Sequence, residues 1–323
     1  MSETAVLLCG HGSRDPDAVG EFEEAATALR ARLAHLDPGS DFATGYLEFA
    51  RPTIGEGLAT LASRGARRIL AIPGMLFAAS HVKNDLPWEM NSFMAANPGI
   101  EVRLGRDLGI DPKLLDAAAA RIAAALPDGG SGGRSDTLLV VVGRGTNDPD
   151  ANSNIAKVAR MLWEGMGFGW AEAAFSGVAD PRVDAALERS ARLGFRRIVV
   201  FPYFLFTGIL VKRIYAQTDL VAARYPDIEF VKAGYLRDHA GVIDAFVDRA
   251  LEFAAGDPNG DPGGEPRMNC QLCKYRTRII GYEDAVGTPQ QGHHHHVRGA
   301  GVDHHQPHPH DHHDHHDHHD HEG

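Results

Sequence analysis

The strongest constraint on the fold of this chain is an internal duplication. The segment VLLCGHGSRDPDAV near the start matches VVVGRGTNDPDANS further on, with shared Gly, Asp and Pro positions at a constant offset of 133 residues (143 − 10). A longer pair follows in the same order: the segment that starts at Arg51 matches the one that starts at Asp180, at an offset of 129 residues (181 − 52). Because two blocks recur in order, we infer that one domain occurs twice, with a period far too long for a solenoid.

Each half alternates continuous apolar runs with Ala-, Leu- and Glu-rich helical stretches. Each half begins with an apolar run, AVLLCG or TLLVVVG, which is followed by a Gly/Asp/Pro loop and a helix. A later strand in each half is expected at RRILAIPGMLF or RRIVVFPYFLF. Fully apolar strands between amphipathic helices indicate a parallel sheet that is covered on both faces. The sequence therefore predicts an α/β fold with two duplicated, doubly wound parallel-sheet domains.

Composition sets the expected boundaries. We expect an N-terminal domain at 1–127, a Gly/Ser/Asp-rich linker at 128–136 and a C-terminal repeat at 137–255. Residues 256–323 combine a second linker, a Cys-x-x-Cys motif and a His/Asp-rich tail. This region has too few apolar residues to offset the entropy of ordering, so the His-rich tail is expected to be disordered without metal.

Charge and hydropathy exclude several classes of function. The net charge is −11 and no basic stripe is present, which argues against a nucleic-acid partner. No apolar run reaches the roughly 20 residues that cross a membrane, and the N-terminus has no basic region typical of a signal peptide. Three cysteines are too few for a disulfide framework. These features predict a protein of the reducing cytoplasm.

Two histidines and a glutamate are expected at one mouth of the first sheet. His11 follows the first strand within GHGSRDP, His81 follows the strand ILAIPGMLF, and Glu48 follows another extended segment. Ligands of open parallel sheets bind beyond the carboxyl ends of the strands. Two imidazoles and a carboxylate form a plausible open site for a divalent ion such as Co²⁺, Fe²⁺, Ni²⁺ or Zn²⁺, or they serve as acid–base groups. The alternative is that each His is only a satisfied polar residue of a Gly-rich loop.

The duplication favours the functional reading. In the second half Arg144 stands in place of His11 and Leu210 in place of His81, while the surrounding Gly, Asp, Pro and Lys positions persist. Residues needed only for the fold should persist in both copies. We therefore expect one functional site, in the first half, and a degenerate second half that walls the cleft.

The segments HGSRDP, LEFARP and LFAASHVKNDLP resemble the class II tetrapyrrole chelatases, specifically the long-form sirohydrochlorin cobaltochelatases. With the duplication, the resemblance covers roughly the first 250 residues, and the chain departs from the pattern only in its second repeat. The resemblance implies insertion of Co²⁺ into sirohydrochlorin in cobalamin biosynthesis. It also implies that His11, His81 and Glu48 are the metal-site and catalytic residues.

Cationic side chains near the mouth are candidates for anchoring the substrate, because sirohydrochlorin is a polycarboxylate. We name Arg14, Arg51 and Lys83 as candidate substrate-binding residues. The alternative for each is a solvated surface charge.

Cys270 and Cys273 form a Cys-x-x-Cys pair in MNCQLCKYR, where nearby basic residues favour thiolates. Two thiolates do not complete a four-ligand site, so a second chain, tail histidines or Cys9 would have to contribute. The long chelatases carry this motif as an iron–sulfur site, which the resemblance implies here, with a homodimer if two chains share a cluster. Zinc or a redox-active dithiol is the alternative.

The end of the chain holds 15 of the 19 histidines (19 − 4), many in repeated HHD units. His-rich tracts bind divalent metals, and Asp adds hard ligands. We expect a metal reservoir; a purification tag and a merely solvated tail are the alternatives. Its histidines include His293, His294, His295, His296, His312, His313, His315, His316, His318 and His319.

Other functions stay open at this point. A chelatase of the same class could make sirohaem with Fe²⁺ or handle Ni²⁺, because borderline metals share these ligands. A non-catalytic metal-storage protein would account for the tail but would not need a duplicated α/β cleft with two mouth histidines. A periplasmic-type binding protein also has two α/β lobes, but the chain shows no export signal.

Overall fold

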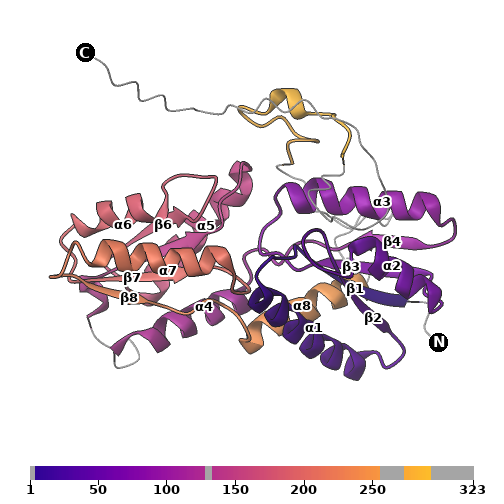
Figure 1. The fold of residues 1–323 in the computed structure, drawn as a ribbon, viewed down its shortest axis with the longest axis horizontal. Coiled ribbons are helices and arrows are strands. Elements are labelled where there is room, and N and C mark those ends of the chain that lie inside the picture. Colours follow the sequence, from indigo (N-terminus) through magenta and orange to yellow (C-terminus); the bar gives the residue numbers. More distant parts are fainter. Residues whose placement is uncertain (1–3, 128–132, 255–272, 292–323) are drawn as a thin grey trace, which may run out of the picture.

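The computed structural model describes residues 4–127, 133–254 and 273–291, and these contain two four-stranded parallel sheets. Cys270 and the His-rich tail lie outside the described residues. The two sheets have matching strand orders, β2-β1-β3-β4 and β6-β5-β7-β8 (Figure 1). The predicted duplication of a parallel α/β domain is thereby confirmed. The strands are β1 (Thr4–Gly10), β2 (Asp41–Tyr46), β3 (Arg68–Pro73) and β4 (Glu101–Leu104), then β5 (Thr137–Gly143), β6 (Trp170–Phe175), β7 (Arg197–Pro202) and β8 (Glu229–Lys232).

The helices start where the sequence repeats its Asp-Pro-Asp motif. Asp15 and Asp148 are N-cap residues whose carboxylates accept hydrogen bonds from the backbone N–H two residues on, and a proline follows each at the first helical position. The repeated motif is therefore a helix-start signal placed directly after a strand. The helices are α1 (Pro16–Leu36), α2 (Ile54–Ser63), α3 (Leu86–Ala96), α4 (Pro112–Ala125), α5 (Pro149–Met166), α6 (Val183–Ala191), α7 (Ile209–Ala222) and α8 (Ala240–Ala254).

The central strands are buried on both faces, as their continuous apolar sequences require. In β1, Val6 and Leu8 belong to one core cluster, whereas Leu7 and Cys9 belong to another on the opposite face of the sheet. All seven residues of β5 are buried. Each sheet is thus covered by helices on both sides, which is the doubly wound arrangement.

The last helix of each half crosses to the other half. The helix α8 packs on α1 and β3 of the first half, where Figure 1 shows it beside α1. The helix α4 packs on α5 of the second half. Phe246 of α8 is fully buried in the same core cluster as Leu8 of β1. One core cluster therefore runs through both halves, an exchange that the order of elements along the chain does not reveal.

Ion pairs reinforce the exchanged helices. Arg249 on α8 donates a hydrogen bond to Asp111 at the start of α4 over 3.0 Å, and both side chains are buried. On α4, Arg121 donates to the backbone carbonyl of Leu236 over 3.1 Å. The two halves are interlocked by packing and by buried charge.

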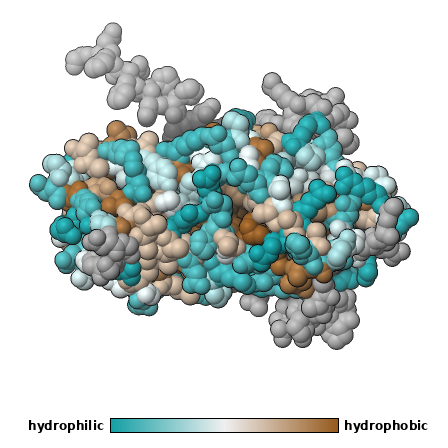
Figure 2. Space-filling view, turned by 90° about the horizontal axis from the view of Figure 1, so that it is seen from below, coloured by the Kyte–Doolittle hydropathy of each residue, from teal (hydrophilic) through white to brown (hydrophobic). Residues whose placement is uncertain are grey.

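Within the described ranges, no helix is long and apolar enough to cross a membrane. On the face in Figure 2, hydrophilic residues are interspersed with several hydrophobic areas.

Candidate active site

The loops after β1 and β2 touch through their backbones. The N–H of Glu48 donates to the carbonyl of His11 over 3.0 Å. Gly12 has a φ of +87°, and a Cβ at this position would lie 1.7 Å from the carbonyl oxygen of Glu48. Only glycine permits this approach. Residue 12 must therefore be Gly for the His11 loop to lie against the Glu48 loop.

The second half repeats this loop contact without the functional side chains. The N–H of Gly177 donates to the carbonyl of Arg144 over 2.9 Å. A Cβ on Gly145 would lie 1.8 Å from the carbonyl oxygen of Gly177. Gly177 is thus the counterpart of Glu48. All three candidate ligands of the first half are replaced in the second, although the loops keep their backbone geometry.

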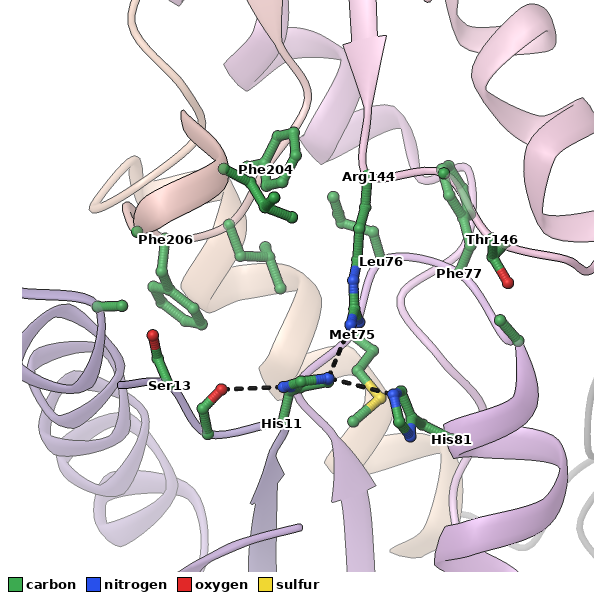
Figure 3. A pocket seen from close by; sticks show the side chains of 18 of the residues that line it. His11, Ser13, Met75, Leu76, Phe77, His81, Arg144, Thr146, Phe204 and Phe206 are labelled. Carbon is green, nitrogen blue, oxygen red and sulfur yellow. Dashed lines mark hydrogen bonds between the residues drawn. The ribbon is translucent and has the colours of Figure 1, made fainter. Parts of the chain in front are cut away.

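His11 and His81 meet edge to face in a pocket between the halves (Figure 3). Their Nε2 atoms lie 3.1 Å apart. His11 is held by β1, and His81 begins a π-helical turn, His81–Asp85, that leads into α3. The two strand ends bring together side chains that are 70 residues apart in the sequence.

Neighbouring groups fix the orientation of both rings. Nδ1 of His11 lies 2.9 Å from the carbonyl oxygen of Gly12, and Nδ1 of His81 lies 2.6 Å from a carboxylate oxygen of Asp85. Because both partners are acceptors, each Nδ1 carries the proton and each Nε2 presents a lone pair. The two lone pairs therefore converge.

The charge state of His11 also suits a ligand. Burial, followed by the positive charge of Arg144 and by His81, lowers the pKa of His11 to about 3. His11 is therefore neutral near pH 7. Metal–imidazole bonds are about 2.1 Å long, so two imidazole nitrogens on one ion lie roughly 3.0–3.4 Å apart. The observed spacing of 3.1 Å fits two nitrogens on one ion.

The backbone of Glu48 contacts that of His11, and Glu48 is buried. Its negative charge acts on Arg144, raising the pKa of a guanidinium whose pKa is otherwise lowered by burial. Within residues 4–127, 133–254 and 273–291, no three His, Cys, Asp or Glu side chains are grouped as a metal-binding set. The role of Glu48 as a third ligand remains a prediction.

The cavity around the histidines has a volume of about 800 Å³ and lies between the halves. Aromatic rings from both halves line it, including Phe77 and Tyr203, which stack with centroids 5.9 Å apart. Among the described residues that line it, none is acidic, whereas Arg14, Arg144 and Arg213 all reach it. In a chain with a net charge of −11, this apolar and cationic cavity suits a large, flat, anionic ligand.

The three predicted anchoring cations have different positions. Arg14 lines the cavity, with its guanidinium 4.7 Å from the centroid of the Phe49 ring. Arg51 is exposed, forms an ion pair with Glu56 and does not line the cavity. Arg14 thus remains a candidate anchor on geometry, and Arg51 has no geometric support.

The prediction for Lys83 is wrong. Lys83 is only 2% exposed, and its ammonium donates to Asp148 and Asp150 of the second half, both over 2.9 Å. Its counterpart Lys212 donates to Asp15 and Asp17 over 2.7 and 2.8 Å. These reciprocal pairs join the halves. A buried ammonium with two carboxylate partners is not available to a substrate.

The contact between Lys212, which is exposed, and Asp15 can be tested by varying the pH. The hydrogen bond from Lys212 lowers the pKa of Asp15 below its usual value. A lowered pKa means that the pair stabilises the fold above the unfolded pKa of about 3.9 and loses its effect as pH falls through the folded pKa. We expect Lys212→Met to lower the thermal midpoint at pH 7, with a difference from the unaltered protein that shrinks toward pH 3.

The measurement is thermal unfolding, followed by circular dichroism at a series of pH values. Lys232→Met is the control, because Lys232 pairs with the exposed Asp219. A difference that stays constant from pH 7 to pH 3 would contradict the assignment.

The segment 273–291 packs against the His81 turn. The sequence did not predict this contact. The side chain of Asn84 donates to the carbonyl of Gln291 over 2.5 Å and accepts from its N–H over 2.8 Å. Asn84 also donates to Asp85 over 2.6 Å. Cys273, the described member of the Cys-x-x-Cys motif, is fully buried at the start of this segment. The described segment that starts at Cys273 is thus hydrogen-bonded to the His81 turn through Gln291.

Sequence comparison assigns the chain to a family. The sequence profile of the CbiX family matches residues 5–125 and 138–253. A sirohydrochlorin cobaltochelatase of Priestia megaterium is 34% identical over 283 residues, 87% of each chain. A sirohydrochlorin ferrochelatase of the same organism is 31% identical over 240 residues, 74% of this chain and 86% of its own length.

A solved structure agrees with this result. The sirohydrochlorin chelatase SirB from Bacillus subtilis subspecies spizizenii, in complex with cobalt, matches with a TM-score of 0.64 and 26% identity. The match covers 79% of this chain and 97% of that chain. With both repeats matched by one profile, this chain belongs to the CbiX family.

Proposed function

We propose that this protein is a sirohydrochlorin cobaltochelatase, an enzyme that inserts Co²⁺ into sirohydrochlorin in cobalamin biosynthesis. One observation carries the proposal: two imidazole lone pairs converge, with Nε2 atoms 3.1 Å apart, on a cavity lined by aromatic rings and arginines. The family and the cobaltochelatase relative support the same activity.

In the proposed reaction the site residues first bind the metal ion and later accept protons from the macrocycle. His11 and His81 bind the incoming Co²⁺ through Nε2, and Glu48 balances part of its charge. The macrocycle lies in the cavity between the aromatic rings, and Arg14 is a candidate partner for its carboxylates. Insertion moves the ion from the imidazoles to the four pyrrole-type nitrogens and releases two N–H protons. The vacated Nε2 lone pair of His81 and the carboxylate of Glu48 are available to accept those protons.

Co²⁺ is favoured over Fe²⁺ and Ni²⁺ by the relatives and by the tail. The cobaltochelatase relative is 34% identical and the ferrochelatase relative 31%, a narrow difference. Imidazole ligands bind Co²⁺ and Ni²⁺ more tightly than Fe²⁺ in the usual affinity order. A tail that holds 15 histidines is therefore better suited to buffer Co²⁺ or Ni²⁺.

The iron–sulfur site at Cys270 and Cys273 remains a prediction that rests on the resemblance to the long chelatases. Among the described cysteines, Cys9 does not suit such a site, because burial within β1 raises the pKa of its thiol far above the usual range. The remaining ligands must come from a second chain or from the tail. Iron and sulfide analysis of anaerobically purified protein, with its molar mass in solution, tests both the cluster and the shared-cluster homodimer.

The experiment that tests the proposed function follows the absorbance of sirohydrochlorin anaerobically after Co²⁺ is added, with and without the protein. We expect metallation well above the spontaneous rate, and faster with Co²⁺ than with Fe²⁺ or Ni²⁺. A rate equal to the spontaneous one with all three metals would refute the enzyme and leave metal storage as the better account.

A smaller effect is expected at Asp85, whose carboxylate holds Nδ1 of His81. The negative charge of Asp85 makes Nε2 of His81 a stronger metal ligand, and Asp85→Asn removes this charge. We therefore expect the Co²⁺ affinity of the site to fall about 10- to 100-fold. Competition with a coloured chelator measures this affinity. Asp116→Asn, on the exposed face of α4, is the control. Equal affinities for the two variants would contradict the role.

A further inference from the structure

Arg144 reaches across the cavity from the second half to the metal-binding nitrogen of the first (Figure 3). Its Nη2 lies 2.9 Å from Nε2 of His11. Nδ1 of His11 is already engaged by the carbonyl of Gly12, so Nε2 is the lone pair that the ring can offer. A guanidinium has donors and no acceptor, so Arg144 occupies this lone pair.

The contact with Arg144 and a bond from His11 to a metal are mutually exclusive. One lone pair cannot serve two partners, and a guanidinium at hydrogen-bond distance would also repel an arriving divalent cation. The two nitrogens of His81 face other groups: its Nε2 faces His11, and its Nδ1 faces Asp85. Metal binding by both histidines therefore requires Arg144 to move.

The substrate carries the groups that can move Arg144. Sirohydrochlorin is a polycarboxylate, and the planar fork of a guanidinium binds a carboxylate through two parallel hydrogen bonds. No acidic residue is among the described residues that line the cavity, so a substrate carboxylate meets no competitor there for the guanidinium. Glu48 attracts Arg144 but belongs to the adjoining loop.

We propose that Arg144 is a positioning residue that couples substrate binding to metal binding. It holds the His11 lone pair until a carboxylate of the tetrapyrrole draws the guanidinium away, and His11 is then released to bind Co²⁺. The proposal rests on the proposed function and adds an order to it: the macrocycle enters first, and the site then gains affinity for the metal. By linkage, the two ligands strengthen each other by the same factor.

Arg144→Leu should change the two affinities in opposite directions. Without tetrapyrrole, we expect Co²⁺ to bind the site about 10-fold more tightly, because the competing donor and its charge are gone. Without metal, we expect sirohydrochlorin to bind about 10-fold more weakly, because a carboxylate partner is lost. A variant that is merely damaged would bind both ligands more weakly.

The full chain is used, and Co²⁺ affinity is measured anaerobically by competition with a coloured chelator. The 15 tail histidines are expected to bind Co²⁺ as well, so the titration of a His11→Ala/His81→Ala variant is subtracted from every curve. Sirohydrochlorin binding is measured by its absorbance change in the presence of excess chelator. Arg213→Leu is the matched control, because Arg213 lines the same cavity, whereas Arg144 is the arginine hydrogen-bonded to His11.

Arg213→Leu should leave Co²⁺ affinity unchanged. An Arg144→Leu variant whose Co²⁺ affinity is unchanged or weaker would overturn the coupling. If that happens while the unaltered protein still metallates sirohydrochlorin, only the role of Arg144 fails. If the unaltered protein neither binds nor metallates sirohydrochlorin, the proposed function fails with it.

Discussion

His81→Ala is expected to reduce the catalysed rate of Co²⁺ insertion into sirohydrochlorin by about 10²- to 10⁴-fold, the range for loss of a positioned acid–base group. His81 supplies one of two lone pairs whose atoms lie 3.1 Å apart, so its loss leaves the metal with His11 alone. It also removes one acceptor for the pyrrole protons. The measurement is the anaerobic absorbance change of sirohydrochlorin, with the spontaneous rate subtracted.

Two controls separate this effect from general damage. His35→Ala changes an exposed histidine in the last turn of α1 and should leave the rate unchanged. His11→Ala/His81→Ala should reduce the rate no more than about 10-fold below His81→Ala, because residues that act as a unit are not additive. If His81→Ala kept the full rate, the histidine pair of the first half would not be the reaction site.

Phe246→Ala is expected to have the largest effect on stability, lowering the free energy of unfolding by about 3–5 kcal/mol. Phe246 is fully buried on α8, within the core cluster that includes β1 and β5 residues. Removal of the ring leaves a cavity where the halves interlock. Denaturant unfolding measures the effect, with the midpoint and slope compared to those of the unaltered protein.

The same helix supplies the control. Leu251 lies on α8 but is 43% exposed, so Leu251→Ala should change the free energy of unfolding by less than about 1 kcal/mol. Because the core is continuous, far-ultraviolet circular dichroism and the fluorescence of Trp88 in the first half and of Trp163 and Trp170 in the second should give one coincident transition. Two separated transitions would mean that the halves unfold independently, contrary to the exchanged packing.

The sequence predicted the convergence of His11 and His81, because both follow strands of one parallel sheet and the carboxyl ends of such strands meet. It did not predict Asp85. Asp85 reaches His81 through a π-helical turn, and the sequence HVKND has no pattern that predicts such a turn. A His and an Asp four residues apart also occur on ordinary helices, so their spacing does not indicate a role at the site.

The errors and omissions share one physical cause, which is contact between the halves. Lys83 was assigned to the substrate because a lysine beside a strand end is usually solvated, yet it is buried against two carboxylates of the second half. Arg144 was recognised as the counterpart of His11, but not as its neighbour at 2.9 Å. Alignment of repeats shows which positions correspond, whereas the way the two copies face each other depends on the exchange of α4 and α8.

That exchange has a consequence for how the chain is made. The ribosome completes β4 at Leu104 and finishes α8 at Ala254, 150 residues later (254 − 104). At roughly 5–20 residues per second, the first sheet waits on the order of 10 s for the helix that covers one of its faces. The nascent first half therefore exposes apolar surface while the second is still being translated. We expect it to need protection by chaperones during synthesis rather than folding as it emerges.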